Sequence, residues 1–210
     1  MRLLILGLPR SGTTSLIRGI KAEGYHDIIE PFNGGLQNAV ERDYPLRDLY
    51  DHDYVVVKNT TYQKPRTWKS DWFSFCLEFF ENFDKIIFLD RSDFESHFDS
   101  IVHLWYRVGT KSTTMQAWSD EDIPKDFRNE YVTGGGLDKL HKEKKDLRKV
   151  IEMIGYRGSI VYYEDLYGEN RTKSLEIIQS WELPKVNCER LNSFLHPSRK
   201  LYRGEKRQLL

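Results

Sequence analysis

The fold is decided by residues 1–20, which read MRLLILGLPRSGTTSLIRGI. The apolar run Leu3–Gly7 predicts a buried strand, and the apolar face formed by Leu16, Ile17 and Ile20 predicts a helix after it. A glycine-rich turn separates the two. A strand, a glycine turn and a helix in succession are typical of the first unit of an α/β domain.

The rest of the chain repeats this alternation of strand-like and helix-like stretches. Apolar stripes at helical spacing occupy Phe94–Trp105 and Leu175–Trp181, and the polar stretch Lys111–Gly136 favours a loop or lid. Further strands are predicted at Ile28–Ile29, Tyr54–Lys58, Lys85–Leu89 and Ser159–Tyr163. We therefore expect one α/β domain over residues 1–210, with three layers and a central parallel sheet of about five strands flanked by helices.

Composition narrows the classes of partner. The 32 basic and 32 acidic residues balance, so no overall field favours nucleic acid or an anionic membrane. The apolar start, Met1–Leu8, is far too short to span a bilayer and lacks a cleavage region. Cys76 and Cys188 have neither the number nor the spacing of a disulfide framework or metal site. We expect a cytoplasmic protein with no membrane or nucleic-acid partner.

The glycine turn has the spacing of a phosphate-binding loop. Between Gly7 and Thr14, several backbone N–H groups can converge on one anion at the positive end of the following helix. A nucleoside-triphosphate loop carries Lys where this chain has Thr13. Arg10, inside the loop, supplies a cation instead. This pattern favours a single 5′-phosphate bearing a transferable group over a triphosphate with magnesium.

At this point the sequence resembles a family. Residues 8–15, LPRSGTTS, are similar to the 5′-phosphosulfate loop of sulfotransferases that use 3′-phosphoadenosine-5′-phosphosulfate (PAPS). Tyrosylprotein and Golgi carbohydrate sulfotransferases are closest, because they carry Arg in this loop. The resemblance implies a P-loop-like α/β fold, PAPS as co-substrate, no metal, and a hydroxyl-bearing acceptor. The loop residues that it assigns to PAPS are Arg10, Ser11, Gly12, Thr13, Thr14 and Ser15.

The family also implies a site for the 3′-phosphate, built from an Arg that ends a strand and a Ser on the next helix. Arg91 follows the predicted strand Lys85–Leu89, and the usual spacing of eight residues leads to Asp99. Ser100, nine residues on, matches the spacing in bacterial trehalose-type sulfotransferases. We predict that Arg91 and Ser100 bind the 3′-phosphate. The alternative is that Arg91 forms a salt bridge with a neighbouring carboxylate, Asp93 or Glu95.

Two more segments are similar to parts of the family. Residues 162–166, YYEDL, resemble a segment whose Tyr lies near adenine, which assigns base stacking to Tyr163. A core tyrosine is the alternative. The basic tail at residues 199–207 stands where the family has a loop over the 3′-phosphate, so Arg199 and Lys200 are candidate ligands. A solvated tail is the other interpretation.

Sulfuryl transfer is an in-line displacement that needs cations near the leaving phosphate and a base near the acceptor hydroxyl. We assign the first role to Arg10 and to Lys58, which ends a predicted strand and matches a family lysine. An ordinary surface lysine is the alternative. Glu30 resembles a Glu-Pro segment of carbohydrate sulfotransferases and is the predicted base. His97 and His103 are the competing candidates, since cytosolic members of the family use histidine.

Two other functions fit parts of the sequence. A P-loop nucleotide kinase would share the fold, although Thr13 replaces the lysine that it needs. A module that binds the product 3′,5′-ADP (PAP) without catalysis would share the whole site. Residues 34–53 and 109–155 match no motif and are expected to shape the acceptor pocket. A carbohydrate or small-molecule acceptor is favoured over a protein.

Overall fold

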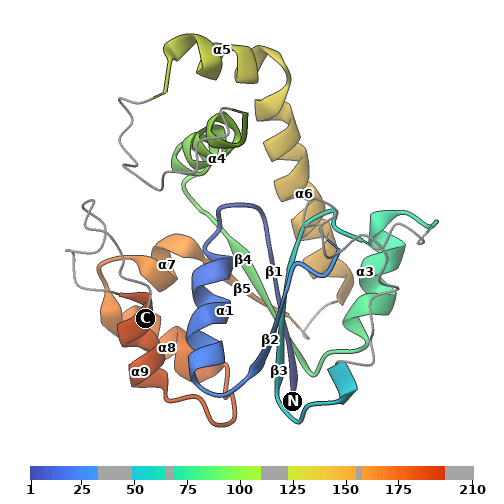
Figure 1. Ribbon diagram of the computed structural model, residues 1–210, viewed down its shortest axis with the longest axis vertical. Coiled ribbons are helices and arrows are strands. Elements are labelled where there is room, and N and C mark those ends of the chain that lie inside the picture. The colour runs from blue at the N-terminus through green and yellow to red at the C-terminus, as the bar shows by residue number, and fades with distance from the viewer. Residues whose placement is uncertain (33–48, 65–68, 110–122, 155–157, 197–210) are drawn as a thin grey trace.

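The structure is a computed structural model that describes residues 1–32, 49–64, 69–109, 123–154 and 158–196. Strands and helices alternate along the chain (Figure 1). In chain order the elements are β1 (Arg2–Gly7), α1 (Thr13–Ala22), β2 (His26–Ile29), β3 (Val55–Thr60), α3 (Trp72–Phe80), β4 (Lys85–Asp90), α4 (Phe94–Gly109), α5 (Lys125–Thr133), α6 (Gly136–Ile154), β5 (Gly158–Tyr162), α7 (Tyr163–Tyr167), α8 (Arg171–Ser180) and α9 (Cys188–Leu195).

The five strands form one sheet in the order β2-β3-β1-β4-β5, and every pairing is parallel. The chain runs from β1 to β2 at one edge of the sheet and then back to β3. After β3 it crosses β1 to reach β4 on the other side. This reversal places α1 on one face of the sheet and α3 on the other (Figure 1). Ligands of open α/β sheets bind at such a reversal, outside the carboxyl ends of the strands.

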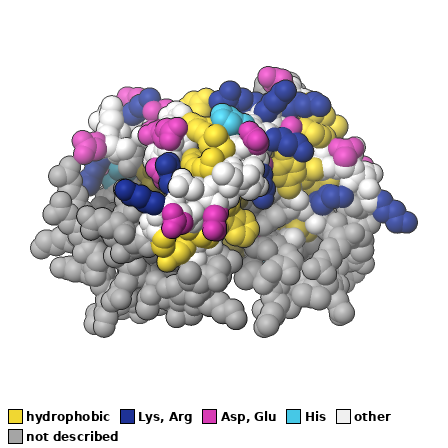
Figure 2. Space-filling model, turned by 90° about the horizontal axis from the view of Figure 1, so that it is seen from above, with side chains coloured by type: hydrophobic (Ala, Val, Ile, Leu, Met, Phe, Trp, Pro, Cys, Tyr) yellow, Lys and Arg dark blue, Asp and Glu magenta, His cyan; other side chains and the backbone are white. Residues whose placement is uncertain are grey.

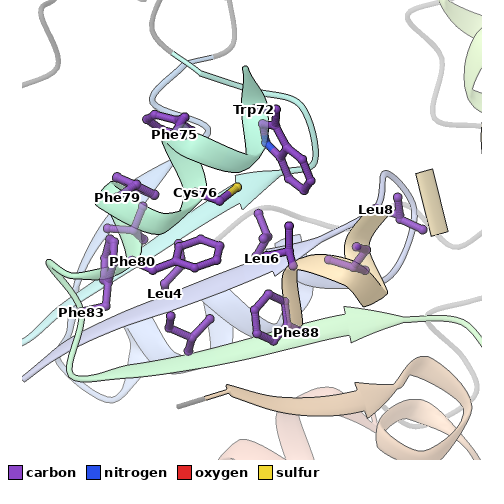
Figure 3. Packing of buried hydrophobic residues seen from close by; sticks show 14 of the residues in the cluster. Leu4, Leu6, Leu8, Trp72, Phe75, Cys76, Phe79, Phe80, Phe83 and Phe88 are labelled. Carbon is purple, nitrogen blue, oxygen red and sulfur yellow. The ribbon is translucent and has the colours of Figure 1, made fainter. Parts of the chain in front are cut away.

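Each face of the sheet has its own hydrophobic core, because successive side chains of a strand point to opposite faces. Leu4 and Leu6 of β1 pack with the aromatic residues of α3 and with α6, as Figure 3 shows for the α3 side. Leu3 and Ile5 pack with α1, α8 and α9. We call these the α3 face and the α1 face. A strand buried on both faces reads as an unbroken apolar run, which explains why β1 was recognisable in the sequence.

The predicted fold class is confirmed: the protein is α/β, with a central five-stranded parallel sheet between two helical layers. Within the ranges that the structure describes, no helix combines the length and apolar character needed to cross a bilayer. On the described part of the face seen in Figure 2, basic and acidic side chains intermingle without a region of one sign.

Three local predictions were wrong. Lys58 does not end its strand, because β3 continues to Thr60 and all six of its residues are buried. The polar stretch Lys111–Gly136 is not one loop, because residues 125–133 form α5. Trp105 was expected to complete the apolar stripe of α4, yet it is 43% exposed, while the residues in the middle of that stripe are buried.

Candidate functional site

The glycine turn after β1 forms a tight loop that leads directly into α1. Arg10 and Gly12 both have positive φ values, 70° and 89°. The Ser11 hydroxyl donates a hydrogen bond to the carbonyl of Leu8 at 2.7 Å. A Cβ on Gly7 would lie 2.6 Å from Ser11 Oγ, so only glycine allows this close return of the chain. The loop thus brings its backbone to the start of a ten-residue helix, whose N-terminus favours an anion.

The other predicted loop residues lie in the first turn of α1. Thr13 is buried, whereas Thr14 and Ser15 are half-buried. Thr13 begins the helix at the position where a triphosphate-binding loop has lysine. The cation of this loop is Arg10, which lies three residues after Gly7. Gly7 itself pairs with Thr60 of β3 and with Leu89 of β4.

Arg10 reaches across the sheet edge to α4. Its Nε–H donates a hydrogen bond to the Ser100 hydroxyl at 3.1 Å, although the two residues are 90 positions apart in the sequence. The next-door residue Asp99 turns the other way and pairs with Arg128 of α5 at 2.6 Å. Of the two spacings considered, the structure therefore places Ser100 beside the loop and Asp99 away from it.

His97 of α4 holds the loop through a hydrogen bond to its backbone. Its Nε2 lies 2.9 Å from the carbonyl of Pro9, and the side chain is fully buried. Burial lowers the pKa of His97 to about 4, so the ring is neutral near pH 7 and Nε2–H donates to that carbonyl. A buried ring committed to the backbone holds the loop in place, which removes His97 as a candidate base. His103, the other histidine considered, is half-buried further along α4.

A buried ion pair lies beside His97. Lys144 of α6 donates to Asp90 Oδ1 at 2.5 Å and to the carbonyl of Arg91 at 2.6 Å. Asp90 ends β4 and is 1% exposed. His97 Nδ1 lies 4.0 Å from the same carboxylate oxygen. This pair joins α6 to the carboxyl end of β4, next to the loop.

Sequence reasoning missed both members of this pair, although a signal was present. Lys144 interrupts an apolar stripe of α6, four residues after Leu140 and three before Leu147, both of which are buried. A lysine inside an apolar stripe requires a buried acceptor. Asp90, at the end of a strand with unbroken apolar residues, was the natural partner.

Arg91 and Ser100 are not brought into contact. The Arg91 guanidinium donates to the carbonyl of Ser96 at 3.0 Å and lies over the Tyr163 ring, 4.1 Å from its centre. Among the described residues it forms no ion pair with Asp93 or Glu95, so the salt bridge considered as the alternative is not formed there. Its Nε is buried and has no hydrogen-bond partner in the described part of the chain.

Two tyrosines of α7 cover the loop at Gly12. The rings of Tyr163 and Tyr167 stack with centres 4.6 Å apart, and the Tyr167 hydroxyl donates to the carbonyl of Gly12 at 2.7 Å. The sequence predicted a strand that includes Tyr163, but β5 ends at Tyr162 and Tyr163 is the first residue of α7. It is half-buried and contacts Arg91 and Tyr167, so it lies at the site and is not a core tyrosine.

Glu30 and Lys58, the predicted base and its neighbouring cation, form an ion pair. Glu30 follows β2 with a φ of 48°, and its amide donates to the carbonyl of Lys58 at 2.8 Å. The Lys58 side chain is 6% exposed and the Glu30 side chain 19%. Lys58 is therefore not a surface lysine. The remaining candidates, Arg199 and Lys200, lie outside the described residues.

Comparison with known proteins adds one structure. The chain is similar to the YorR protein from Bacillus subtilis, solved in complex with phosphorylated GDP, with 15% identity and a TM-score of 0.45. The similarity covers 86% of this chain and 96% of that one. No protein-family model and no curated protein matches the sequence. The residues of the site itself are therefore the basis for assigning a function.

Proposed function

We propose that the protein is a sulfotransferase that moves a sulfuryl group from PAPS to an acceptor hydroxyl. The observation that carries the proposal is the hydrogen bond between Arg10 and Ser100. These residues were assigned separately to the 5′- and 3′-phosphate parts of the nucleotide site, and their contact supports one continuous anion site along the sheet edge. Arg91 and Tyr163 extend the same edge beyond the loop.

The residues fit PAPS better than a triphosphate. The loop amides, the start of α1 and Arg10 suit one phosphate group. A kinase would need a lysine at Thr13 and a carboxylate close to the metal. Asp90 is the buried carboxylate beside the loop, and Lys144 already pairs with it. No observation favours the kinase as a second candidate.

The transfer step assigns a role to each polar side chain. The acceptor oxygen forms a bond to sulfur while the bond from sulfur to the 5′-phosphate oxygen breaks. The electron pair goes to the leaving phosphate, where Arg10 stabilises the added charge. The acceptor hydroxyl proton passes to the Glu30 carboxylate. Lys58, which contacts that carboxylate, holds it at the carboxyl edge of the sheet. A carbohydrate or small molecule remains the proposed acceptor.

The test is ligand-induced stabilisation, because a ligand that binds only the folded state raises Tm. PAP without magnesium should raise Tm more than ATP with magnesium. An equal or larger effect of ATP with magnesium contradicts the proposal.

A variant of the loop cation makes the test specific. Arg10→Asn should weaken PAP by about ten- to a hundred-fold, the size of a lost charge-assisted hydrogen bond. Asn is chosen because it tolerates the positive φ of this position. Arg18→Ala, an exposed arginine of α1, is the matched control and should bind PAP like the wild type. An enzyme must also transfer a sulfuryl group to an acceptor. PAP binding without turnover on any acceptor would show that the protein is a binding module and not a sulfotransferase.

A further inference from the structure

Buried polar atoms gather without partners at the carboxyl end of β3. Asn59 Oδ1, Thr60 Oγ1 and Thr61 Oγ1 have no hydrogen-bond partner among the described residues. All three residues are at least nine-tenths buried, with exposures of 1%, 6% and 7%. A buried polar atom without a partner destabilises the folded state, so such atoms in native proteins point to water or a ligand.

Thr60 and Thr61 lie on opposite faces of the sheet, because successive side chains of a strand alternate between the two faces. Val55 and Val57 belong to the core of the α3 face, and Val56 belongs to the core of the α1 face. Thr60 therefore projects to the α1 face, together with Lys58. The Thr61 amide continues the ladder by donating to the carbonyl of Gly7, which puts the Thr61 side chain on the α3 face.

On the α1 face, Thr60 is the strand residue next to the phosphate loop. It pairs with Gly7 in the register of β1 and β3, and paired residues of neighbouring strands are about 5 Å apart. A Cβ on Gly7 would meet Ser11 and Thr13 at 2.6 and 2.8 Å, so the loop packs over this part of the face. Thr60 thus lies on the same face as Lys58 and opposite Gly7, the residue from which the loop starts.

We propose that Thr60 is a further anion-binding residue of this site, and that its hydroxyl donates a hydrogen bond to the 5′-phosphate of the bound nucleotide. The proposal rests on the proposed function for the identity of the nucleotide. It explains why the Thr60 hydroxyl is buried and, within the described residues, has no partner, next to a loop whose backbone suits a phosphate. Valine would have the same shape and no unpaired atom.

Substitution of the two threonines tests this assignment. Thr60→Val removes an unpaired hydroxyl, so it should raise the Tm of the empty protein by a few degrees while weakening PAP by about ten-fold. Thr60→Ser keeps the hydroxyl and should retain the affinity for PAP. Thr61→Val is the matched control on the opposite face, and it should raise Tm without changing that affinity. Unchanged PAP affinity in Thr60→Val, or an equal loss in Thr61→Val, overturns the proposal.

A second probe separates this proposal from the proposed function. Inorganic pyrophosphate carries two linked anionic groups and no adenosine, and its affinity should also fall about ten-fold in Thr60→Val. If the wild type binds pyrophosphate but not PAP, the sulfotransferase proposal fails and the pyrophosphate affinities still decide the role of Thr60. If the wild type binds neither probe, both proposals fail.

Discussion

The two sides of the phosphate loop differ in how their polar groups are used. On the β4 side, Arg10 bonds to Ser100, His97 bonds to the carbonyl of Pro9, and Lys144 pairs with Asp90. These contacts join the loop and β4 to α4 and α6. On the β2–β3 side, an ion pair stands beside hydroxyl groups that have no partner among the described residues. The β4 side ties the loop and β4 to two helices, although the buried Nε of Arg91 there also lacks a partner among the described residues. The β2–β3 side is distinguished by its hydroxyl groups, which are unpaired within those same residues.

The largest expected effect comes from breaking the buried pair on the β4 side. Lys144→Ala leaves the Asp90 carboxylate buried and unpaired, so the free energy of unfolding should fall by about 3–5 kcal/mol. Urea denaturation measures the loss. Lys142→Ala, at an exposed position of the same helix, is the control and should change little. The double variant Lys144→Met with Asp90→Asn should recover much of the stability. A small effect of Lys144→Ala would remove the contrast between the two sides.

The next effect depends on pH and also belongs to the β4 side. The folded-state pKa of His97 is about 4, below the ordinary value of 6.5, because the ring is buried. Unfolded protein therefore takes up a proton that folded protein does not, and stability falls as pH drops from 6.5 towards 4, by up to about 1.4 kcal/mol per pH unit. His97→Gln keeps an N–H for the carbonyl of Pro9 and does not titrate. Its unfolding free energy, measured in urea at several pH values, should decline less steeply than that of the wild type. Parallel profiles would show that another group controls the acid sensitivity.

On the β2–β3 side, the expected effect is on turnover. Glu30→Gln should lower the sulfuryl transfer rate by roughly 100-fold, the usual contribution of a general base, with little change in PAP affinity. Steady-state kinetics and calorimetry together separate the two quantities. Unchanged turnover would exclude Glu30 from the chemical step and leave His103 as the remaining candidate among the groups considered.

The smallest expected effect is on the affinity for PAP relative to AMP, and it tests which residues bind the 3′-phosphate. PAP differs from AMP by its 3′-phosphate, so the ratio of their affinities isolates the groups that hold that phosphate. Arg91→Ala should weaken PAP by about ten- to a hundred-fold and leave AMP nearly unchanged, because its guanidinium offers charge-assisted hydrogen bonds. Ser100→Ala should have a weaker effect of the same kind.

Asp99→Ala is the control for this titration. Asp99 pairs with Arg128 at an exposed position and points away from the loop, so its removal should leave both affinities unchanged. Equal losses of PAP and AMP in Arg91→Ala would show that Arg91 supports the packing on Tyr163 and does not bind the 3′-phosphate.

The features that sequence reasoning predicted correctly depend on local pattern. The apolar run of β1, the glycines of the loop and the face of α1 lie within twenty residues, and each is specified by its own side chains. The parallel sheet followed from the same alternation along the chain. Ser100 was assigned to the 3′-phosphate site only through its spacing from Arg91, and its hydrogen bond in the structure is with Arg10 of the loop.

The features that were missed depend on contacts between distant segments. The Asp90–Lys144 pair joins residues 54 positions apart, and no local pattern encodes which helix will cover β4. His97 gave no clear sign of burial, because it flanks the apolar stripe of α4 and its partner is a backbone carbonyl. The extension of β3 beyond Lys58, through Asn59 to Thr60, was missed because polar residues after an apolar run are typical of a loop. Parallel pairing with β1 continues there nonetheless.

The hydrogen bond from Tyr167 to the carbonyl of Gly12 spans 155 positions of the sequence. During synthesis on the ribosome, β1 emerges before its two neighbours β3 and β4, which end only at Thr60 and Asp90. Until those strands arrive, the nascent chain carries an apolar strand with both edges unpaired, a state prone to aggregation. The nucleotide loop gains its last anchor only after α7 has left the exit tunnel. A ribosome-bound fragment that stops before α7 should therefore hold PAP less tightly than the released protein does.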